Sequence, residues 1–362
     1  MSVLNLIRPE LLNKKPYVYN SAPKCRLHAN ELPWSVLNTD IDLNFYPEKN
    51  LLDQLQEQLA KRYQVDSNQM VLTRGSDDGI DLITRLFLSA GQDACMQFSP
   101  TFSMYEFYVY LQNAQLIECS LNPCNNFELS LADVRNSWQK NCKLIFLCNP
   151  NNPTANLIDL DFIASLCDEY KNRSIIVVDE AYIEFAQAQS ATSLITQFEN
   201  IIVLRTLSKA YGLANLRLGI ILAQEHVIQA FNKIMPPFPL SSVVIDLALR
   251  ALEKPEWLMQ SISTIKESRA QLVKELQFFP AIKKVYPTET NFLLVQTDYA
   301  LELTSWFVNQ GIAIKSFLTN SLLHEHIRIT VGSESQNQLL LRALSSFQNN
   351  ISGCKNAKNL IY

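Results

Sequence analysis

Short apolar runs alternate with stretches of helical periodicity along most of this chain. The runs predict seven strands, at residues 70–73, 94–98, 116–119, 143–148, 174–178, 201–204 and 218–222. Helical segments separate them, the clearest at residues 77–88. Near-continuous Val, Ile and Leu runs with helices between them are typical of a mostly parallel sheet covered on both faces. We therefore predict an α/β fold whose large domain holds a mostly parallel seven-stranded sheet sandwiched by helices.

After these strands the pattern changes to a long helical stretch. Leu240-Ser241-Ser242 opens it, and a break is expected near Pro255 before the helix ends near Phe279. Strands at 291–296 and 326–331 and helices at 301–309 and 335–347 then predict a smaller α+β domain. We expect an N-terminal arm (1–30), a large domain (31–248), a small C-terminal domain (249–350) and a tail (351–362) that frays.

Composition narrows the function classes. The 362 residues are 48% hydrophobic, enough for two cores, and the net charge is −4. Without a basic surplus or a Lys/Arg block, we expect neither nucleic acid nor an anionic membrane as a partner. The first residues lack the apolar region of a signal peptide, and no apolar run reaches the roughly 20 residues of a membrane span. We therefore expect a cytoplasmic protein.

The cysteine and histidine positions predict no metal site. None of the eight Cys has C-x-x-C spacing, which argues against structural zinc. His324 and His326 flank Glu325 in what is interpreted as a solvated loop. Cys142 and Cys148 bracket an apolar strand, where thiols behave as small hydrophobic groups. A reduced, cytosolic protein fits this pattern better than a disulfide scaffold does.

Two charged residues stand where apolar strands end. Lys209 follows the strand at 201–204, and Asp179 ends the strand at 174–178. Ligands bind at such strand ends in open α/β sheets, and a carboxylate at the end of an apolar strand is costly without a partner. A surface lysine and a turn-forming aspartate are the ordinary alternatives, but the surrounding residues favour a chemical role.

Two neutral polar groups extend this set. Tyr182 lies three residues after Asp179, and Asn152 lies in Asn152-Pro153-Thr154. Their phenol and amide could both hydrogen-bond one ring oxygen, and Pro153 fixes the local φ that aims the amide. Taken alone, each residue has a simpler explanation, as a packing tyrosine and as an ordinary turn.

An anion site is predicted between the strand at 70–73 and the helix that follows it. Gly75-Ser76-Asp77-Asp78 places the backbone amides of Ser76 and Asp77 at the helix N-terminus, where amides bind anions. Acidic side chains are also favourable at a helix start, so both interpretations of Asp77 can hold. Thr206 and Ser208 add two hydroxyls to this site. Arg217 adds a guanidinium fork that is suited to phosphate.

Together these groups are the set needed to hold pyridoxal 5'-phosphate (PLP) and use it as an electron sink. The carboxylate would keep the pyridine nitrogen protonated, and the lysine would bind the aldehyde and later move a proton. Phe102 could stack on the pyridine face, and core packing explains it equally well. Arg328 lies in an apolar strand and needs an anionic partner. That partner is either a substrate anion or the carboxylate of a structural ion pair. Taken alone, an arginine in such a strand slightly favours the structural ion pair.

These motifs resemble the fold-type-I PLP-dependent aminotransferases, and among them the histidinol-phosphate aminotransferase family. The resemblance covers nearly the whole chain. Each motif is short, and their order and spacing make the joint match specific. The segments that carry it are His28–Glu31, Tyr46-Pro47, Arg74–Ile80, Asn151–Thr154, Asp179–Phe185, Arg205–Ala210 and Arg328–Gly332.

The resemblance implies a homodimer with each active site at the subunit interface. Its implied catalytic residues are Lys209 as the Schiff-base lysine, Asp179 at the pyridine nitrogen and Tyr182 at the ring oxygen. Further implied cofactor-binding residues are Ser76, Asp77, Phe102, Asn152, Thr206, Ser208, Arg217 and, from the neighbouring subunit, Tyr46. The implied substrate-binding residues are Tyr17 from the arm, Asn30, Asn152, Lys315 and Arg328.

Four positions depart from the family's pattern. Ala155 replaces the usual Gly after Asn-Pro-Thr, which costs energy if the backbone needs a positive φ. Asp77-Asp78 replaces Asp-Glu, and Phe102 replaces the Tyr of some members. Lys315 replaces a second substrate-facing Arg, which keeps the charge and loses bidentate geometry.

The resemblance implies transamination between histidinol phosphate and 2-oxoglutarate, giving imidazole acetol phosphate and glutamate in histidine biosynthesis. An aminotransferase for aromatic amino acids and a decarboxylase of threonine phosphate could use the same cofactor site. Rates with phenylalanine and threonine phosphate would separate them from the first function. A non-catalytic regulator that binds PLP should tolerate loss of Lys209 and carry a DNA-binding module, for which so short an arm has no room.

Overall fold

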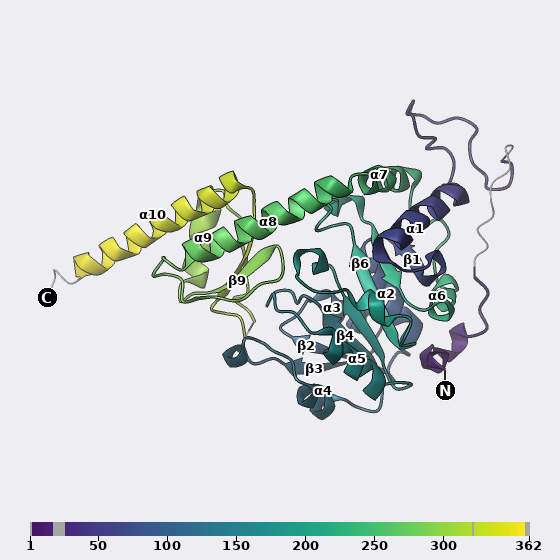
Figure 1. The fold of residues 1–362 in the computed structure, drawn as a ribbon, viewed down its shortest axis with the longest axis horizontal. Helices are drawn as coiled ribbons and strands as arrows, with labels where there is room; N and C mark the ends of the chain where they lie inside the picture. The colour runs from purple at the N-terminus through teal and green to yellow at the C-terminus, as the bar shows by residue number, and fades with distance from the viewer. Residues whose placement is uncertain (1, 17–25, 321, 359–362) are drawn as a thin grey trace.

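The computed structural model describes residues 2–16, 26–320 and 322–358. Its larger sheet has the strand order β1-β7-β6-β5-β4-β2-β3 (Figure 1). All seven predicted strands are present, with bounds shifted by one or two residues. They are β1 (Met70–Thr73), β2 (Ala94–Ser99), β3 (Gln115–Ser120), β4 (Cys142–Cys148), β5 (Ile175–Asp179), β6 (Ile201–Thr206) and β7 (Gly219–Leu222).

The sheet is mostly parallel, as predicted. Strands β3, β2, β4, β5 and β6 run parallel, and β7 is antiparallel to both β6 and β1. Helices cover both faces: α1 (Lys49–Tyr63), α2 (Ser76–Phe87), α3 (Met104–Leu111), α4 (Leu131–Ser137), α5 (Leu160–Glu169), α6 (Glu225–Asn232) and α7 (Ser242–Leu252). Side chains of a strand alternate between faces, so Ile176 and Val178 enter one core and Ile175 and Val177 the other.

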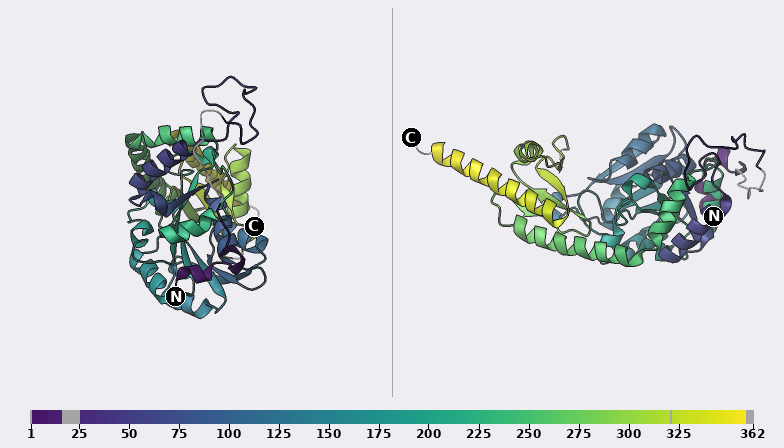
Figure 2. Two further views of the ribbon diagram at one scale, coloured as in Figure 1. Left: turned by 90° about the vertical axis from the view of Figure 1, so that its right-hand side faces the viewer. Right: turned by 90° about the horizontal axis from the view of Figure 1, so that it is seen from above.

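Helix α8 (Pro255–Leu276) connects the large domain to a smaller one, and Figure 2 shows it running along both. The Ser241 hydroxyl caps α7 by accepting the Val244 N–H at 3.3 Å, and Pro255 begins α8, as the sequence predicted. Leu258 at one end of α8 packs in the large-domain core, and Leu276 at the other packs in the small-domain core.

The small domain contains the sheet β10-β11-β9-β8, which is antiparallel throughout. Its elements are β8 (Lys284–Val285), β9 (Phe292–Gln296), α9 (Ala300–Asn309), β10 (Lys315–Ser316), β11 (His326–Thr330) and α10 (Glu334–Lys358). The pattern missed β8 and β10 because two-residue strands carry too little periodicity to detect. Helix α10 continues to Lys358, through residues that were predicted to fray.

The N-terminal region divides into two parts. Val3, Leu6 and Ile7 are buried in the large-domain core beside α6, which the expected arm did not anticipate. Residues 26–48 form neither helix nor strand and extend outward beside α1 and α7 (Figure 1). In the ranges described, no helix is both long and apolar enough to span a membrane.

Candidate active site

The loops that follow β4, β5 and β6 meet at one edge of the large sheet. Asp179 is the last residue of β5, and it stands in register with Cys148 at the end of β4 and Leu204 in β6. Because parallel neighbours end at the same edge, their following loops bring Asn152 and Lys209 to the same side as Asp179.

Asp179 is almost completely buried, with 2% of its surface exposed. Its Oδ2 accepts a hydrogen bond from the Tyr105 hydroxyl at 2.8 Å, and its Oδ1 accepts one from the Ala181 N–H at 3.1 Å. Burial raises the pKa of this carboxyl to about 6, because desolvation outweighs the two donors. The site therefore contains an acidic group whose charged form would be stabilised by a cationic partner.

Tyr105 is a site residue that sequence reasoning missed. It lies in α3, where its position in an apolar helix indicated only packing. Its ring is fully buried, stacked on Phe146 at 4.7 Å and edge-on to Phe102 at 5.7 Å. The usable signal was the phenol itself, since a buried hydroxyl needs a polar partner. Phe102 thus contacts the ring whose hydroxyl donates to Asp179.

Lys209 lies within electrostatic reach of four other charged groups. Burial lowers the pKa of Lys209, Arg328 and Arg217 lower it further, and Asp179 and Asp77 oppose them. Its Nζ lies 5.4 Å from the centre of the Tyr182 ring. The predicted amine and carboxylate are thus in one site, and the amine is shifted toward its neutral, nucleophilic form.

Tyr182, Asn152 and Arg328 form one contact chain. The Asn152 Nδ2 donates to the Tyr182 hydroxyl at 3.5 Å, and its Oδ1 accepts from the Arg328 guanidinium. Burial lowers the pKa of Arg328, whose guanidinium lies 5.2 Å from the centre of the Phe292 ring. Among the described residues Arg328 has no carboxylate partner in an ion pair, so the structural ion pair is not observed.

The predicted anion site is a tight backbone cradle. Helix α2 begins at Ser76 and Asp77 after Gly75, whose φ is +85° and which offers no side-chain cap. A Cβ on Gly219 would come within 2.3 Å of the Gly75 carbonyl carbon, and one on Gly75 within 2.6 Å of Arg217 Nη2. At Gly219 only glycine permits this approach, because a Cβ there would meet backbone, and at Gly75 the positive φ favours glycine. The N-terminus of α2 therefore lies at the cradle, where helix amides favour an anion.

Two hydroxyls and an ion pair complete the cradle. The Thr206 hydroxyl lies 3.0 Å from that of Ser208, and β6 places it in register with Gly219. Arg217 Nη2 lies 3.1 Å from the Asp77 carboxylate, and both side chains are partly exposed. The cradle can thus bind an anion through backbone amides, hydroxyls and a guanidinium.

Within one copy of the chain, the remaining predicted residues lie outside this cluster. Lys315 is exposed on β10 and stands directly opposite Arg328 in register. Asn30 is exposed, with φ +58°. Tyr46 stacks on Phe238, with ring centres 4.4 Å apart. Tyr17 lies outside the described residues.

A buried ionic cluster behind Asp179 was not singled out by the sequence. Arg205, near the end of β6, contacts Glu180 at 3.2 Å and Glu184 at 2.6 Å. Burial raises the pKa of Glu180, whose carboxylate also accepts from the Ser190 hydroxyl at 2.5 Å. These contacts tie the ends of β5 and β6, which carry Asp179 and the Lys209 loop. Nothing in the local sequence indicates the pairing of Arg205 with Glu180.

The Ala155 position behaves as the departure from the family pattern suggested. Its φ is +66° and it is fully buried in the loop after Asn152. A non-glycine residue in this region costs about 1–2 kcal/mol. The Ala155 N–H donates to the Asn151 carbonyl at 2.8 Å, and its carbonyl accepts from the Glu289 N–H at 3.0 Å, so the neighbouring backbone maintains the conformation.

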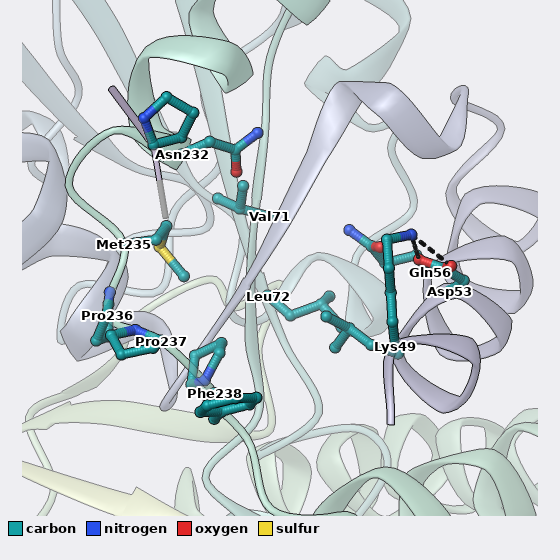
Figure 3. A pocket seen from close by; sticks show the side chains of 13 residues that line it. Lys49, Asp53, Gln56, Val71, Leu72, Asn232, Met235, Pro236, Pro237 and Phe238 are labelled. Carbon is teal, nitrogen blue, oxygen red and sulfur yellow. Dashed lines mark hydrogen bonds and ion pairs between the residues drawn. The ribbon is translucent and has the colours of Figure 1, made fainter. Parts of the chain in front are cut away.

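A cavity of about 440 Å³ lies apart from this cluster, between α1, β1 and residues 235–239. Figure 3 shows Lys49 paired with Asp53 on α1, facing Phe238 and Met235 across it. Its lining includes none of the predicted site residues. It does adjoin Tyr46, through the stacked Phe238.

The observed donor set fits PLP. A glycine-lined cradle with free-facing helix amides suits its phosphate, and the buried Asp179 suits a cationic ring nitrogen. Lys209 has the lowered pKa that an amine needs to attack an aldehyde.

Comparison with known proteins identifies related sequences. The model of the family "Aminotransferase class I and II" matches residues 17–344. Histidinol-phosphate aminotransferase 1 of Legionella pneumophila (strain Philadelphia 1) is 57% identical over 364 aligned residues, with 100% of both chains covered. Histidinol-phosphate aminotransferase of Francisella philomiragia is 35% identical, with 94% of each chain covered.

Solved structures share the fold. A putative histidinol-phosphate aminotransferase from Erwinia carotovora has a TM-score of 0.76 at 25% identity, covering 85% of this chain and 88% of its own. An L-threonine-O-3-phosphate decarboxylase from Porphyromonas gingivalis has a TM-score of 0.72 at 24% identity, covering 84% and 91%. The fold alone therefore does not separate these two activities.

Proposed function

Because the chain belongs to the family of class I and II aminotransferases, we propose that it transfers an amino group between histidinol phosphate and 2-oxoglutarate. The products would be imidazole acetol phosphate and glutamate, in a step of histidine biosynthesis. The observation that carries this proposal is the 57% identity, over the full length of both chains, to a protein named histidinol-phosphate aminotransferase. The exposed Lys209 and the buried Asp179 supply the groups that transamination needs.

PLP, when bound, supplies a conjugated ring that delocalises the electron pair left when a Cα proton is removed. Asp179 would hold the ring nitrogen and keep it protonated. Tyr182 and Asn152 would hold the ring oxygen. Because Tyr105 and the Ala181 N–H fix the orientation of the Asp179 carboxylate, its geometry is set before the ring binds.

Lys209 would bind the cofactor's aldehyde and then act as the base that moves the proton of the substrate. Its lowered pKa leaves more of the amine unprotonated near neutral pH, which a general base requires. Arg328 contributes to this, because a nearby cation disfavours a second positive charge. Arg328 therefore helps to lower the pKa of Lys209 before a substrate anion binds.

Arg328 would bind the anionic end of each substrate in turn, the phosphate of histidinol phosphate or a carboxylate of 2-oxoglutarate. Its guanidinium is held by Asn152 and has no carboxylate partner among the described residues, so its fork remains available for a ligand. Lys315, opposite it in register, would add a second positive charge. The phosphate of PLP would be held by Ser76, Asp77, Thr206, Ser208 and Arg217.

We further propose a homodimer. Large apolar side chains of the outward loop are exposed, with Leu27 at 90%, Trp34 at 71% and Val36 at 98%. Such a run on one loop marks a surface that another protein covers. A second copy of the chain that packed here would also cover the cavity in Figure 3 and could receive Tyr46 in its cofactor site.

Steady-state kinetics of the purified PLP-bound enzyme test the function. We expect kcat/KM for histidinol phosphate to exceed that for phenylalanine by about a hundredfold or more. The amount of glutamate formed from 2-oxoglutarate should equal the amount of imidazole acetol phosphate formed. Lys209→Ala is the control, and it should lose turnover with every substrate. A higher kcat/KM for phenylalanine, or CO₂ release from threonine phosphate, would replace this proposal with one of the alternative activities.

We also propose a cytoplasmic location. The cysteines Cys95, Cys119, Cys124, Cys142, Cys148 and Cys167 are free, which is typical of a reducing compartment. Cell fractionation tests it, and recovery of the protein outside the cytoplasmic fraction would contradict it.

A further inference from the structure

Two consecutive residues of the large domain have a left-handed backbone. Asn126 and Phe127, between β3 and α4, both have φ +61°. Asparagine adopts this conformation readily, but for a bulky residue such as phenylalanine it is an outlier. The Phe127 N–H donates to the Asn122 carbonyl at 2.9 Å, and its carbonyl accepts from Asn156 Nδ2 at 3.0 Å. The fold thus holds Phe127 in a strained conformation from both sides.

The Phe127 ring packs in the large-domain core and contacts two rings of the small domain. The fully buried ring lies 5.5 Å from the Tyr286 ring and 6.2 Å from the His326 ring, centre to centre. Tyr286 and His326 are joined by a 3.1 Å hydrogen bond between the hydroxyl and Nε2. Beside them, the Lys284 Nζ donates to Asn126 Oδ1 at 2.6 Å. We call Asn126 and Phe127 the interdomain anchor.

The anchor contacts the strand that carries Arg328. His326 is the first residue of β11, and Arg328 follows two positions later on the same face of the sheet. Strand β11 is interior to the small sheet, between β10 and β9, so it moves only with the whole sheet. The contact of His326 with Phe127 therefore contributes, together with the Glu289–Ala155 hydrogen bond, to placing the Arg328 guanidinium against Asn152.

We propose that the interdomain anchor positions Arg328 for the anionic ends of both substrates. This inference rests on the proposed function, which assigns that role to Arg328. Without the anchor the small sheet would move against the large domain. Arg328 would then be in position to bind a substrate anion for only a fraction of the time. Apparent substrate affinity falls in proportion to that fraction. Arg328 binds the anion equally before and during the chemical step, so KM should rise while kcat stays nearly constant.

Phe127→Leu tests the anchor, and Phe231→Leu is its matched control. Phe231 is also fully buried, packed edge-on against Phe87 in the other large-domain core, away from the small domain. In the PLP-bound enzyme, Phe127→Leu should raise KM for both histidinol phosphate and 2-oxoglutarate about tenfold with kcat within about twofold. Phe231→Leu should leave both KM values unchanged.

A second readout does not depend on the substrate. Hydrogen exchange of the amides at residues 326–330, measured on the PLP-bound enzyme without substrate, should be faster in Phe127→Leu than in Phe231→Leu. Equal KM values and equal exchange in the two variants would overturn the anchor. If the wild-type enzyme does not turn over histidinol phosphate, the proposed function fails, and the exchange comparison alone then supports or overturns the anchor.

A pair of milder variants covers the case in which Phe127→Leu does not fold. Asn126→Gly keeps the left-handed backbone and removes the acceptor for Lys284, whereas Asn126→Asp keeps an acceptor. We expect the Gly variant to raise KM for both substrates severalfold and to speed exchange at residues 326–330, with the Asp variant close to wild type. Wild-type behaviour of the Gly variant in both measurements would overturn the proposal.

Discussion

Replacing Asp179 with Asn should stabilise the PLP-free protein at neutral pH while it removes turnover. Asp179 has 2% of its surface exposed, and burial raises the pKa of its carboxyl from the ordinary 3.8 to about 6. The Tyr105 hydroxyl and the Ala181 N–H favour the carboxylate without offsetting the desolvation. The charged form is therefore less stable in the folded protein than in the unfolded chain, and a neutral amide avoids that cost.

The magnitude follows from the pKa. A difference of about 2 in pKa corresponds to about 3 kcal/mol. The folded protein binds more protons than the unfolded chain between about pH 4 and pH 6, so stability is lost as pH rises through this window. Asn keeps one acceptor and gives up about 1 kcal/mol of hydrogen bonding. We expect Asp179→Asn to be more stable than wild type by about 2 kcal/mol near pH 7.5 and by about 1 kcal/mol near pH 5.

Urea unfolding of the PLP-free proteins at pH 5 and pH 7.5, at one fixed protein concentration, measures both differences. Asp168→Asn is the control, because Asp168 is exposed on α5 and its replacement should give no such pH-dependent gain. The same Asp179→Asn protein, loaded with PLP, should lose orders of magnitude in kcat. The reasoning is refuted if Asp179→Asn is less stable than wild type at pH 7.5, or if its advantage is the same at both pH values.

Three further predictions test the site and its assembly. Lys209→Ala should abolish transamination while circular dichroism shows an unchanged fold; substantial residual turnover would rule out the role of the lysine as base. Tyr105→Phe removes a donor to a buried carboxylate, worth about 1.5–3 kcal/mol, and should raise the pKa of Asp179 by about 1–2. The acid limb of kcat/KM against pH should therefore move to higher pH, and an unmoved limb would show that the 2.8 Å contact is not used. The double variant Trp34→Ser and Val36→Ser should shift the proposed dimer toward monomer in sedimentation velocity, because it removes apolar area from the exposed loop; an unchanged sedimentation coefficient would contradict a dimer surface at this loop.

Much of the site was predictable from short-range signals. Asp179 and Lys209 could be placed because each follows an apolar run, and the ends of parallel strands collect at one edge of a sheet. Ser76 and Asp77 could be placed because Gly75 separates a strand from a helical pattern. The start of α7 near Ser241 could be placed in the same way, because a helix start depends on residues within one turn.

Other contacts depend on residues far apart in the chain. Tyr105 and Asp179 are 74 positions apart, and Arg328 and Asn152 are 176 apart. Local periodicity describes which face of an element is apolar, and it carries no information about which element packs opposite. The interdomain anchor is an extreme case, because the left-handed φ of Phe127 opposes the preference of its own side chain.

The sequence by itself determined the elements, their alternation and the chemistry available at the strand ends, because these depend on side-chain type and on spacing within a few residues. Only the tertiary structure decided that a phenol from α3 supports Asp179 and that the small domain presents Arg328 to Asn152. The physical reason is that such contacts are selected by the packing of whole elements within a domain and of the two domains on each other, where packing outweighs local preference.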